Sequence, residues 1–352
     1  MKVLFDNQIF RRQIYGGISK YFYELNQALP VEVSSIQKGY HINKLLSQSQ
    51  KELFLPYYFY SILQLRDRYS EKPIKTDADF VHSTYYLRKP KRFKNVKNII
   101  TIHDMIYEEI LEKSQYYKTE YCEMADLIIC ISDATKCLLL SKKPHLEKKT
   151  IVIHSGVSEF NLNLYFNDNK SQDDYFVYVG ERYGIKKYKN FDALIDVFFH
   201  NKKYFLENGI SLKIIGSLPL KKEKVKLREL GLESLFNFLG QLDEVNKYKI
   251  ISNSKAIIVP SFYEGFSLSV VEAIVNNVPV ICSRIPVHIE VAKNAAIFFD
   301  PYSREELLSS LKKNLISKPS DIVGIDNWKK LNNYYKQDRL SKDYLKAYSN
   351  II

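Results

Sequence analysis

Short apolar runs alternate with helix-like stretches along the chain, and this alternation is the feature that most constrains its fold. The runs are rich in Val, Ile, Leu and Phe and mostly end at a polar residue or a glycine, as buried strands of parallel sheets do. They span residues 3–5, 78–83, 98–103, 125–132, 150–154, 175–180, 211–216, 236–240, 256–260, 279–283 and 296–300. Helical stretches such as 191–200 and 221–230 separate several of them. The pattern predicts an α/β chain with doubly wound parallel sheets.

The segment 161–174 is the best candidate for a boundary between two domains. Its sequence, NLNLYFNDNKSQDD, is rich in Asn and Asp and interrupts the rhythm of apolar runs. The chain has 352 residues, which is enough for two ordinary domains. We therefore expect an amino-terminal domain over residues 1–160 and a second domain over residues 174–329, each with its own core.

Composition is that of a soluble globular protein and points to an acidic partner. No apolar run reaches the roughly 18 to 20 residues of a membrane span, and the start MKVLFDNQIF lacks the apolar region of a secretory signal. We therefore expect a cytoplasmic protein. The four cysteines, Cys122, Cys130, Cys137 and Cys282, form no Cys-x-x-Cys pair, which predicts reduced thiols. A formal net charge of +12 favours anionic lipid, nucleic acid or a phosphorylated substrate as the partner.

Residues 256–282 combine two strand-like runs with a turn and a helix that together carry two carboxylates. Apolar residues recur at helical spacing over 268–275, and Ser267 is placed to cap the first turn of this helix. A glycine in the turn lets the backbone approach a ligand, and the start of the helix offers unpaired amides to a phosphate. Because the turn follows a strand of a doubly wound sheet, Glu264 and Glu272 are expected to border one crevice. A solvent-facing glutamate beside an ordinary turn is the structural alternative.

Two glutamates with seven residues between them, the first followed by Gly-Phe and the second by Ala, resemble the signature of the family 4 glycosyltransferases. Members are retaining enzymes with the GT-B fold, in which two Rossmann-like domains face each other across a cleft. A C-terminal helix, here at about 330–352, returns to the first domain. The resemblance implies that Glu264 hydrogen-bonds the donor sugar and that Glu272 binds the ribose hydroxyls. The donor-binding residues expected beside them are Gly265, Phe266, Ser267 and Leu268.

Basic residues after the run 175–180 resemble the positions at which the family binds the nucleotide diphosphate. An arginine and a lysine there neutralise the diphosphate and stabilise it as a leaving group. The resemblance places these roles on Arg182 and on Lys189, which stands before the asparagine that opens the next helix. Lys187 is an alternative to Lys189 for the second role. Exposed basic residues in a turn are the structural alternative.

Two segments of the first domain also resemble the family. The Thr-Ile-His-Asp run at 101–104 matches the segment in which a histidine, here His103, points at the donor sugar. Gly16 and Gly17 follow the first strand, where a Gly-Gly pair in the family forms part of the floor of the active-site cleft. A plain flexible turn is the structural alternative for this pair.

Other polar residues at strand ends receive structural interpretations. His82 and His154 are interpreted as core histidines with satisfied hydrogen bonds, and Asp104 as a capping residue. Asp77 and Asp79 have the spacing of a D-x-D metal motif, but this spacing is common by chance, and Asp79 opens a strand.

Two segments of the amino-terminal half bear on the acceptor. Residues 87–97 (LRKPKRFKNVK) hold six basic residues and no acid, and residues 54–60 (FLPYYFY) are mostly aromatic. A basic loop is typically a solvated face, and it can equally attract an anionic membrane surface by about 1 kcal/mol per side chain. The aromatic run fits core packing, a membrane interface or a sugar face. Nucleic acid ranks last, because no known nucleic-acid-binding module accompanies the charge.

The sequence thus predicts a retaining hexosyltransferase that moves a sugar from a nucleotide-diphosphate donor to a hydroxyl of a glycan or lipid-linked glycan. The expected setting is the synthesis of bacterial surface polysaccharide, such as lipopolysaccharide or capsule, with peripheral attachment to the inner face of the plasma membrane. The resemblance implies that no metal or other cofactor is required. The alternatives are a nucleotide-sugar epimerase of the same fold and a non-catalytic lipid- or nucleic-acid-binding relative. The base, sugar, acceptor and linkage are not specified by the sequence.

Overall fold

The computed structural model describes residues 1–14, 16–30, 32–36, 41–44, 46, 76–86, 96–110, 118–157, 174–183, 187–313 and 318–351. The chain divides into two compact units, Met1–Gly156 with Gln337–Ile352 and Val157–Lys336. The aromatic run 54–60, the basic residues 88–94 and the linker 161–173 lie outside the described residues. Among the described residues, no helix has the length and apolar content needed to cross a membrane.

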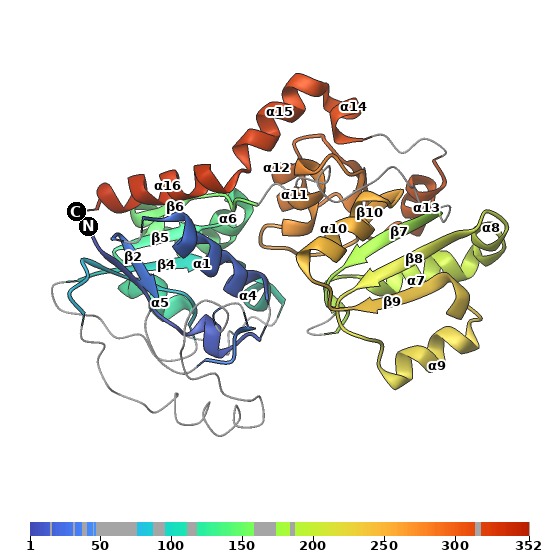
Figure 1. The fold of residues 1–352 in the computed structure, drawn as a ribbon, viewed down its shortest axis with the longest axis horizontal. Coiled ribbons are helices and arrows are strands. Elements are labelled where there is room, and N and C mark those ends of the chain that lie inside the picture. Colours follow the sequence, from blue (N-terminus) through green and yellow to red (C-terminus); the bar gives the residue numbers. More distant parts are fainter. Residues whose placement is uncertain are drawn as a thin grey trace. The chain divides into compact units, whose positions relative to one another are not determined.

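The first unit contains a six-stranded parallel sheet in the order β2-β1-β3-β4-β5-β6 (Figure 1). Its strands are β1 (Val3–Phe5), β2 (Ser34–Ile36), β3 (Phe80–Ser83), β4 (Lys97–Ile102), β5 (Leu127–Cys130) and β6 (Thr150–Val152). The order reverses at β1, because β2 and β3 pair with opposite sides of it. β2 was not predicted from the sequence, since its Ser-Ser-Ile sequence contains a single apolar residue.

Alternating side chains of these strands build a core on each face of the sheet. Ile99 belongs to a buried cluster with helices α1 (Gly17–Ala28) and α16 (Gln337–Ser349). Its neighbour Ile100 belongs to a second cluster, with α5 (Lys118–Met124) and α6 (Asp133–Lys142). Successive side chains of a strand point to opposite faces, so a continuous apolar run requires helices on both. The short helix α4 (Ile106–Ile110) follows β4.

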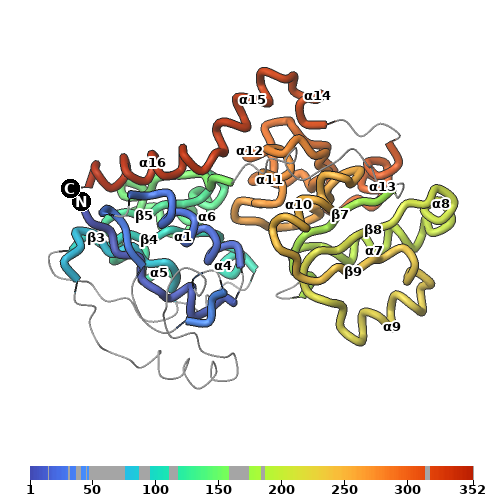
Figure 2. Tube along the Cα trace, in the orientation of Figure 1, coloured from blue at the N-terminus to red at the C-terminus, as the bar shows by residue number. Residues whose placement is uncertain are grey.

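The C-terminal helix α16 lies beside α1 in the first unit (Figure 2). The ring of Tyr348 stacks on Phe80 of β3 with centroids 5.6 Å apart. The Tyr348 hydroxyl lies 2.8 Å from Nδ1 of His82. These contacts confirm the predicted return of a C-terminal helix. The helix begins at Gln337 rather than near 330, because a separate helix, α15 (Ile325–Tyr334), precedes it in the second unit.

The second unit contains another six-stranded parallel sheet, in the order β12-β11-β10-β7-β8-β9. Its strands are β7 (Asp174–Val179), β8 (Ile210–Ile215), β9 (Phe236–Gly240), β10 (Ala256–Val259), β11 (Val280–Ser283) and β12 (Ile297–Phe299). Its other helices are α7 (Phe191–His200), α8 (Lys202–Glu207), α9 (Lys221–Glu229), α10 (Glu244–Ser252), α11 (Leu268–Val275), α12 (Pro286–Ala292), α13 (Arg304–Lys312) and α14 (Pro319–Val323). Two parallel sheets with interspersed helices confirm the predicted α/β class.

Candidate active site

The carboxyl ends of β7 and β10 meet where the strand order of the second sheet reverses. β8 and β9 extend the sheet on one side of β7, and β10 to β12 extend it on the other. β10 pairs directly with β7 in parallel, so the loops that follow both strands leave from the same edge. Open α/β sheets bind ligands at such a reversal. The first loop carries Arg182, Lys187 and Lys189, and the second carries Glu264.

Backbone and side-chain hydrogen bonds fasten these two loops to each other. Asn190, in the left-handed conformation at φ 52°, donates from Nδ2 to the carbonyl oxygens of Pro260 and Pro301, both at 3.0 Å. The backbone N–H of Phe262 donates to the carbonyl of Tyr188 at 2.8 Å. Asn190 is buried, so its amide is a structural tie between loops rather than a surface cap. These hydrogen bonds fix the position of Lys189, which precedes Asn190.

Lys189 and Glu264 form an ion pair at this edge. The Lys189 Nζ donates to Glu264 Oε1 at 2.6 Å, and Ser261 Oγ donates to the same oxygen at 2.7 Å. The Glu264 side chain is 8% exposed and that of Lys189 is 25% exposed. Lys187 instead pairs with Asp192 at 2.5 Å and is 65% exposed. Of the two candidate lysines, the structure therefore brings Lys189 to Glu264.

The residues between Glu264 and α11 hold the turn in place. Gly265 and Phe266 are buried, and the Phe266 ring packs edge-on against Tyr335 at a centroid distance of 6.0 Å. Leu268, half-buried, is the first residue of α11. Ser267 precedes the helix, but the prediction that its side chain caps the first turn is wrong. Its backbone is left-handed at φ 62°, and its hydroxyl contacts Nε2 of His288 at 3.0 Å instead.

His288 supports this turn and was not assigned from the sequence. Its Nδ1 lies 2.8 Å from the Ser283 carbonyl, which can only accept, so Nδ1 carries the proton and Nε2 accepts from Ser267. Burial lowers the pKa of His288 to about 4, with the charge of Glu264 opposing the shift. The histidine is therefore neutral at pH 7. The sequence signal that could have identified His288 was a polar residue within the apolar stretch 286–292.

Glu272 pairs with a second lysine that sequence reasoning missed. Lys247 Nζ lies 3.2 and 3.3 Å from the two carboxylate oxygens of Glu272. Both side chains are 12% exposed. Lys247 comes from α10 and also contacts Glu244 at 3.3 Å. An isolated lysine on a polar helix carries no distinctive sequence pattern, so only the packing of α10 beside α11 identifies it.

Arg182 is buried and lies in an ion pair with Glu223 of α9. Its Nε donates to Glu223 Oε1 at 2.9 Å and its Nη2 to Glu223 Oε2 at 3.1 Å. The guanidinium also lies 4.8 Å from the ring centroid of Phe238. The hydrogen bond and charge of Glu223 outweigh burial and raise the pKa of Arg182. Its Nη1 is buried and has no hydrogen-bond partner among the described residues.

In the first unit, His103 follows β4 and is packed between aromatic rings. Its ring lies 4.9 Å from that of Tyr21 and 5.5 Å from that of Phe22, centroid to centroid. Burial lowers the pKa of His103 to about 4, so the imidazole is neutral at pH 7. Within the described part of the chain its buried Nε2 has no hydrogen-bond partner.

Gly16 and Gly17 lie at the start of α1, beside the side chain of Gln13. Gly16 is the residue before the helix and Gly17 its first residue. Gln13 Oε1 accepts from the backbone N–H of Ser19 at 3.0 Å. A Cβ on Gly16 would lie 2.2 Å from that same oxygen. The absence of a side chain at Gly16 therefore leaves room for the Gln13 side chain to hydrogen-bond with the first turn of α1.

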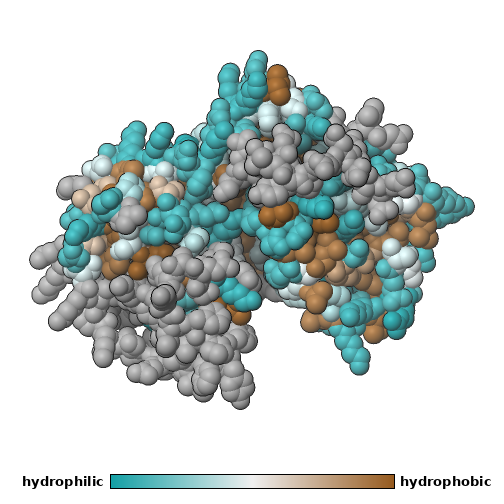
Figure 3. All heavy atoms as spheres, in the orientation of Figure 1, coloured by the Kyte–Doolittle hydropathy of each residue, from teal (hydrophilic) through white to brown (hydrophobic). Residues whose placement is uncertain are grey.

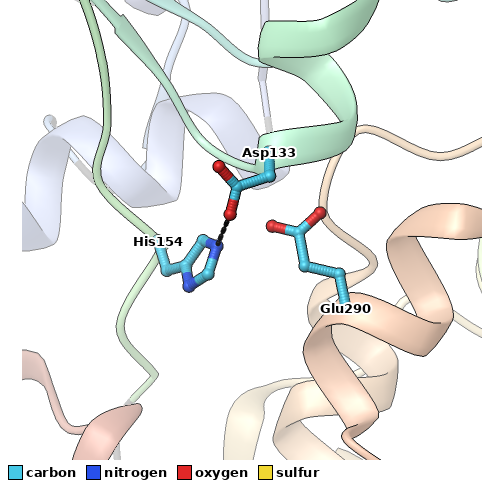
Figure 4. Close-up of side chains that lie close together, drawn as sticks. All are labelled: Asp133, His154 and Glu290. Carbon is cyan, nitrogen blue, oxygen red and sulfur yellow. Dashed lines mark ion pairs between the residues drawn. The ribbon is translucent and has the colours of Figure 1, made fainter.

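The structural interpretations of His82 and Asp104 are supported. His82 makes hydrogen bonds at 2.8 Å through both ring nitrogens, to Tyr348 and Thr101. Asp104 accepts from the Ile106 backbone N–H at the start of α4. His154, mostly buried, lies 3.9 Å from Asp133 of α6 (Figure 4).

Comparison with known proteins gives matches to sugar-transferring enzymes. Residues 164–336 match the family described as "Glycosyl transferases group 1". The O-antigen chain mannosyltransferase RfbU of Salmonella typhimurium is 30% identical over 186 residues, 51% of this chain and 48% of the relative. The O-antigen biosynthesis glycosyltransferase WclY of Escherichia coli is 24% identical and covers 73% of this chain and 72% of its own length. The chain thus spans about half of the first relative and more of the second.

Solved structures match over the full chain. Sucrose-phosphate synthase from Thermosynechococcus elongatus matches with a TM-score of 0.69 and 16% identity, over 100% of this chain and 99% of the other. WaaG, a glycosyltransferase involved in lipopolysaccharide biosynthesis, matches with a TM-score of 0.67 and 14% identity, over 97% and 98%. At such identities the matches establish the fold, and they confirm the predicted GT-B fold.

Proposed function

We propose that the chain, whose residues 164–336 match the group 1 glycosyl transferases, is a retaining member of that family and transfers a hexose from a nucleotide-diphosphate sugar to a hydroxyl of a glycan or lipid-linked glycan. The observation that carries this proposal is the Lys189–Glu264 pair at the strand-order reversal, with Ser261 holding the shared oxygen. A carboxylate fixed by two donors keeps its other oxygen oriented for a sugar hydroxyl.

The charges of the site suit a departing diphosphate. Lys189 stands beside the donor-sugar glutamate, and an ammonium has enough donors to bond a carboxylate and a phosphate oxygen together. Arg182 contributes its positive charge and its Nη1 donor, which has no partner within the described residues. Both cations stabilise the negative charge that grows on the diphosphate as it leaves. Glu272, with Lys247 beside it, binds the ribose hydroxyls of the nucleotide.

The transfer needs no enzymic nucleophile in this proposal. The bond between the anomeric carbon and the diphosphate oxygen breaks, and the acceptor oxygen bonds to the same carbon on the same face. The acceptor hydroxyl proton passes to the departing diphosphate oxygen. The chain's residues position the donor and stabilise charge. The neutral His103 is proposed to act on the donor sugar through its Nε2, whereas the space beside Gly16 is taken by Gln13.

The relatives narrow the substrates to be tested. RfbU is named an O-antigen chain mannosyltransferase and WclY an O-antigen biosynthesis glycosyltransferase. We propose mannose as the first sugar to test, and bacterial surface polysaccharide synthesis as the setting. A lipid-linked acceptor would place the enzyme at the inner face of the plasma membrane, as the net charge of +12 favours.

A thermal-shift screen of UDP, GDP, dTDP and ADP sugars, followed by donor turnover with the best ligand, tests the proposal. Glu264→Gln is expected to abolish turnover while nucleotide binding persists. Glu229→Gln, at an exposed position of α9, is the matched control and should leave both unchanged. Turnover that survives Glu264→Gln would contradict the assigned role. Binding without turnover in the unmodified chain, with every donor and acceptor, would favour the non-catalytic alternative.

A further inference from the structure

An open groove lies next to Glu264, partly on the same loop, and is lined by none of the proposed donor-binding residues. It has a volume of about 430 Å³, within the roughly 300 to 1,000 Å³ of small-molecule sites. The loops after β10, β11 and β12 form it, together with the first turn of α13. Its lining includes Phe262, Tyr263, Arg284, Asp300, Tyr302 and Glu306. We refer to these residues as the Tyr302 groove.

Aromatic side chains form one wall of the Tyr302 groove. Tyr302 is 75% exposed, the most exposed large hydrophobic side chain described in the chain. Its ring stacks on Phe262 with centroids 4.9 Å apart and planes 29° apart. Tyr263, the residue before Glu264, is 38% exposed. A stacked tyrosine presents one ring face to its partner and leaves the other available to a ligand.

Polar groups of both charges also line the groove. Arg284 is exposed and has no ion pair among the described residues. Glu306 Oε2 accepts from the Asp300 backbone N–H, and Asp300 Oδ1 accepts from the Tyr302 backbone N–H, both at 2.8 Å. Each carboxylate is thereby oriented through one oxygen, and its other oxygen has no partner within the described part of the chain. The pocket thus offers both acceptors and donors.

This combination fits a sugar ring. A pyranose has a face of C–H groups, which packs on an aromatic ring, and an edge of hydroxyls, which both donate and accept. The two carboxylates disfavour a phosphate or another anion, and Arg284 disfavours a simple cation. We propose that the Tyr302 groove binds a hexose ring of the glycan that the enzyme extends, beside Glu264. The assignment of that hexose to the acceptor rests on the proposed function, whereas hexose binding itself does not.

The position of the groove supports an acceptor subsite. Tyr263 is adjacent to Glu264 in sequence, and the tie from Asn190 to Pro301 joins the Tyr302 loop to the turn that carries Lys189. A sugar held here would lie at the same sheet edge as the donor residues.

Ligand-observed NMR tests the groove with the methyl glycosides of mannose, galactose, glucose and N-acetylglucosamine, in the presence of the nucleotide that binds best. Saturation transfer to at least one glycoside is expected. Tyr302→Ala should weaken its binding about tenfold, the contribution of one aromatic contact. Tyr302→Phe should retain binding. Phe199→Ala, which removes another exposed aromatic ring, is the matched control and should also retain it.

Three results would overturn the proposal: no signal from any of the four glycosides, a signal that persists in Tyr302→Ala, or a signal that nucleotide sugar displaces. The transfer assay separates this proposal from the proposed function. If transfer occurs, Tyr302→Ala should raise the acceptor KM about tenfold and change the donor KM by less than about twofold. If no donor is turned over but Tyr302-dependent hexose binding remains, the proposed hexose site is supported and the proposed transferase activity is not. Because Tyr302 is exposed, its variants should melt at the unmodified temperature.

Discussion

At the scale of single residues, Lys187 and Lys189 show how strongly a role depends on position within one turn. Both are basic and two residues apart, yet Lys187 pairs with the half-buried Asp192 and Lys189 with the more deeply buried Glu264. The difference follows from the left-handed backbone at both Lys187 and Asn190, which turns the chain between them. Identity of residue type alone does not distinguish them.

The two lysines can be separated by kinetics. Lys189→Ala is expected to lower kcat/KM for the donor by about ten- to a hundredfold, because it removes a charge-assisted hydrogen bond of about 1.5 to 3 kcal/mol. Lys187→Ala is the matched control and should stay within about twofold, since exposed ion pairs contribute little. Steady-state kinetics with varied donor concentration gives both values. A larger loss in Lys187→Ala would reverse the assignment.

Arg182 has a structural partner, so its contribution to catalysis must be separated from its contribution to stability. Arg182→Ala leaves the mostly buried Glu223 without its cation and is expected to destabilise the second unit by about 3 to 5 kcal/mol. The double variant Arg182→Ala with Glu223→Ala should recover most of that stability. We expect it to remain poor in turnover, with kcat reduced more than donor affinity, because charge on the diphosphate grows in the transition state.

Thermal unfolding and steady-state kinetics of the single and double variants measure these effects. Recovery of both stability and turnover in the double variant would show that Arg182 serves only to hold α9. Equal losses in donor affinity and kcat/KM would show that the arginine binds the ground state alone.

His288 should make stability depend on pH. Its pKa is lowered from 6.5 to about 4 in the folded chain, so the unfolded chain binds a proton that the folded chain does not. The contribution of His288 to the free energy of unfolding is therefore expected to be fully present above pH 6.5. It should decrease as the pH falls towards 4, by up to about 1.4 kcal/mol per pH unit. Urea unfolding at pH 7, 6 and 5 measures the slope. His288→Gln should flatten it in part, because His82 and His103 remain. An unchanged slope would contradict the prediction.

At the scale of elements, α10 and α11 place a lysine and a glutamate from different helices at one point. Glu272 lies on α11, whose sequence pattern was recognised, and Lys247 lies on α10, whose polar sequence gave no signal. α11 also shows that a serine before an apolar helical stretch need not act as a cap. The left-handed backbone of Ser267 directs the hydroxyl of this serine towards His288.

Nucleotide binding tests the role of this helix pair. Glu272→Ala is expected to weaken nucleotide binding about ten- to a hundredfold, through loss of charge-assisted hydrogen bonds to the ribose. Glu244→Ala is a close control, because Glu244 contacts the same Lys247 but is 51% exposed. It should bind the nucleotide nearly as the unmodified chain does. Calorimetry with the nucleotide diphosphate measures both, and undiminished binding in Glu272→Ala would remove the ribose role.

At the scale of the whole molecule, positive charge exceeds negative charge by 12, and the two units share it. Figure 3 shows hydrophilic side chains over α16 in the first unit and over α9 in the second. The densest basic segment, 88–97, lies largely outside the described residues, so its role as a membrane contact stays a prediction.

Vesicle binding tests that role. Binding to anionic vesicles at low salt is expected, with loss in about 0.5 M salt, because salt screens the attraction. Vesicle binding should be abolished when serine replaces four basic residues of this segment, Arg88, Lys89, Lys91 and Arg92. In the matched control, serine replaces four basic residues of α9, Lys221, Lys222, Lys224 and Lys226, and binding should be retained. Nucleotide binding should persist throughout. A protein that ignores anionic vesicles at low salt would point to a soluble acceptor.

The sequence by itself determined what depends on local pattern. Apolar runs of strand length, the helical spacing of 268–275 and the spacing of Glu264 and Glu272 each lie within a few dozen residues, so periodicity and motif were enough to predict the parallel sheets and the GT-B fold. Only the tertiary structure decided which distant groups meet. The reversal of strand order between β7 and β10 brings Lys189 to Glu264 across 75 residues, and α9 brings Glu223 to Arg182 across 41. His288 and Lys247 escaped sequence reasoning for the same reason: their partners are set by how strands and helices are ordered in space, which no local pattern encodes.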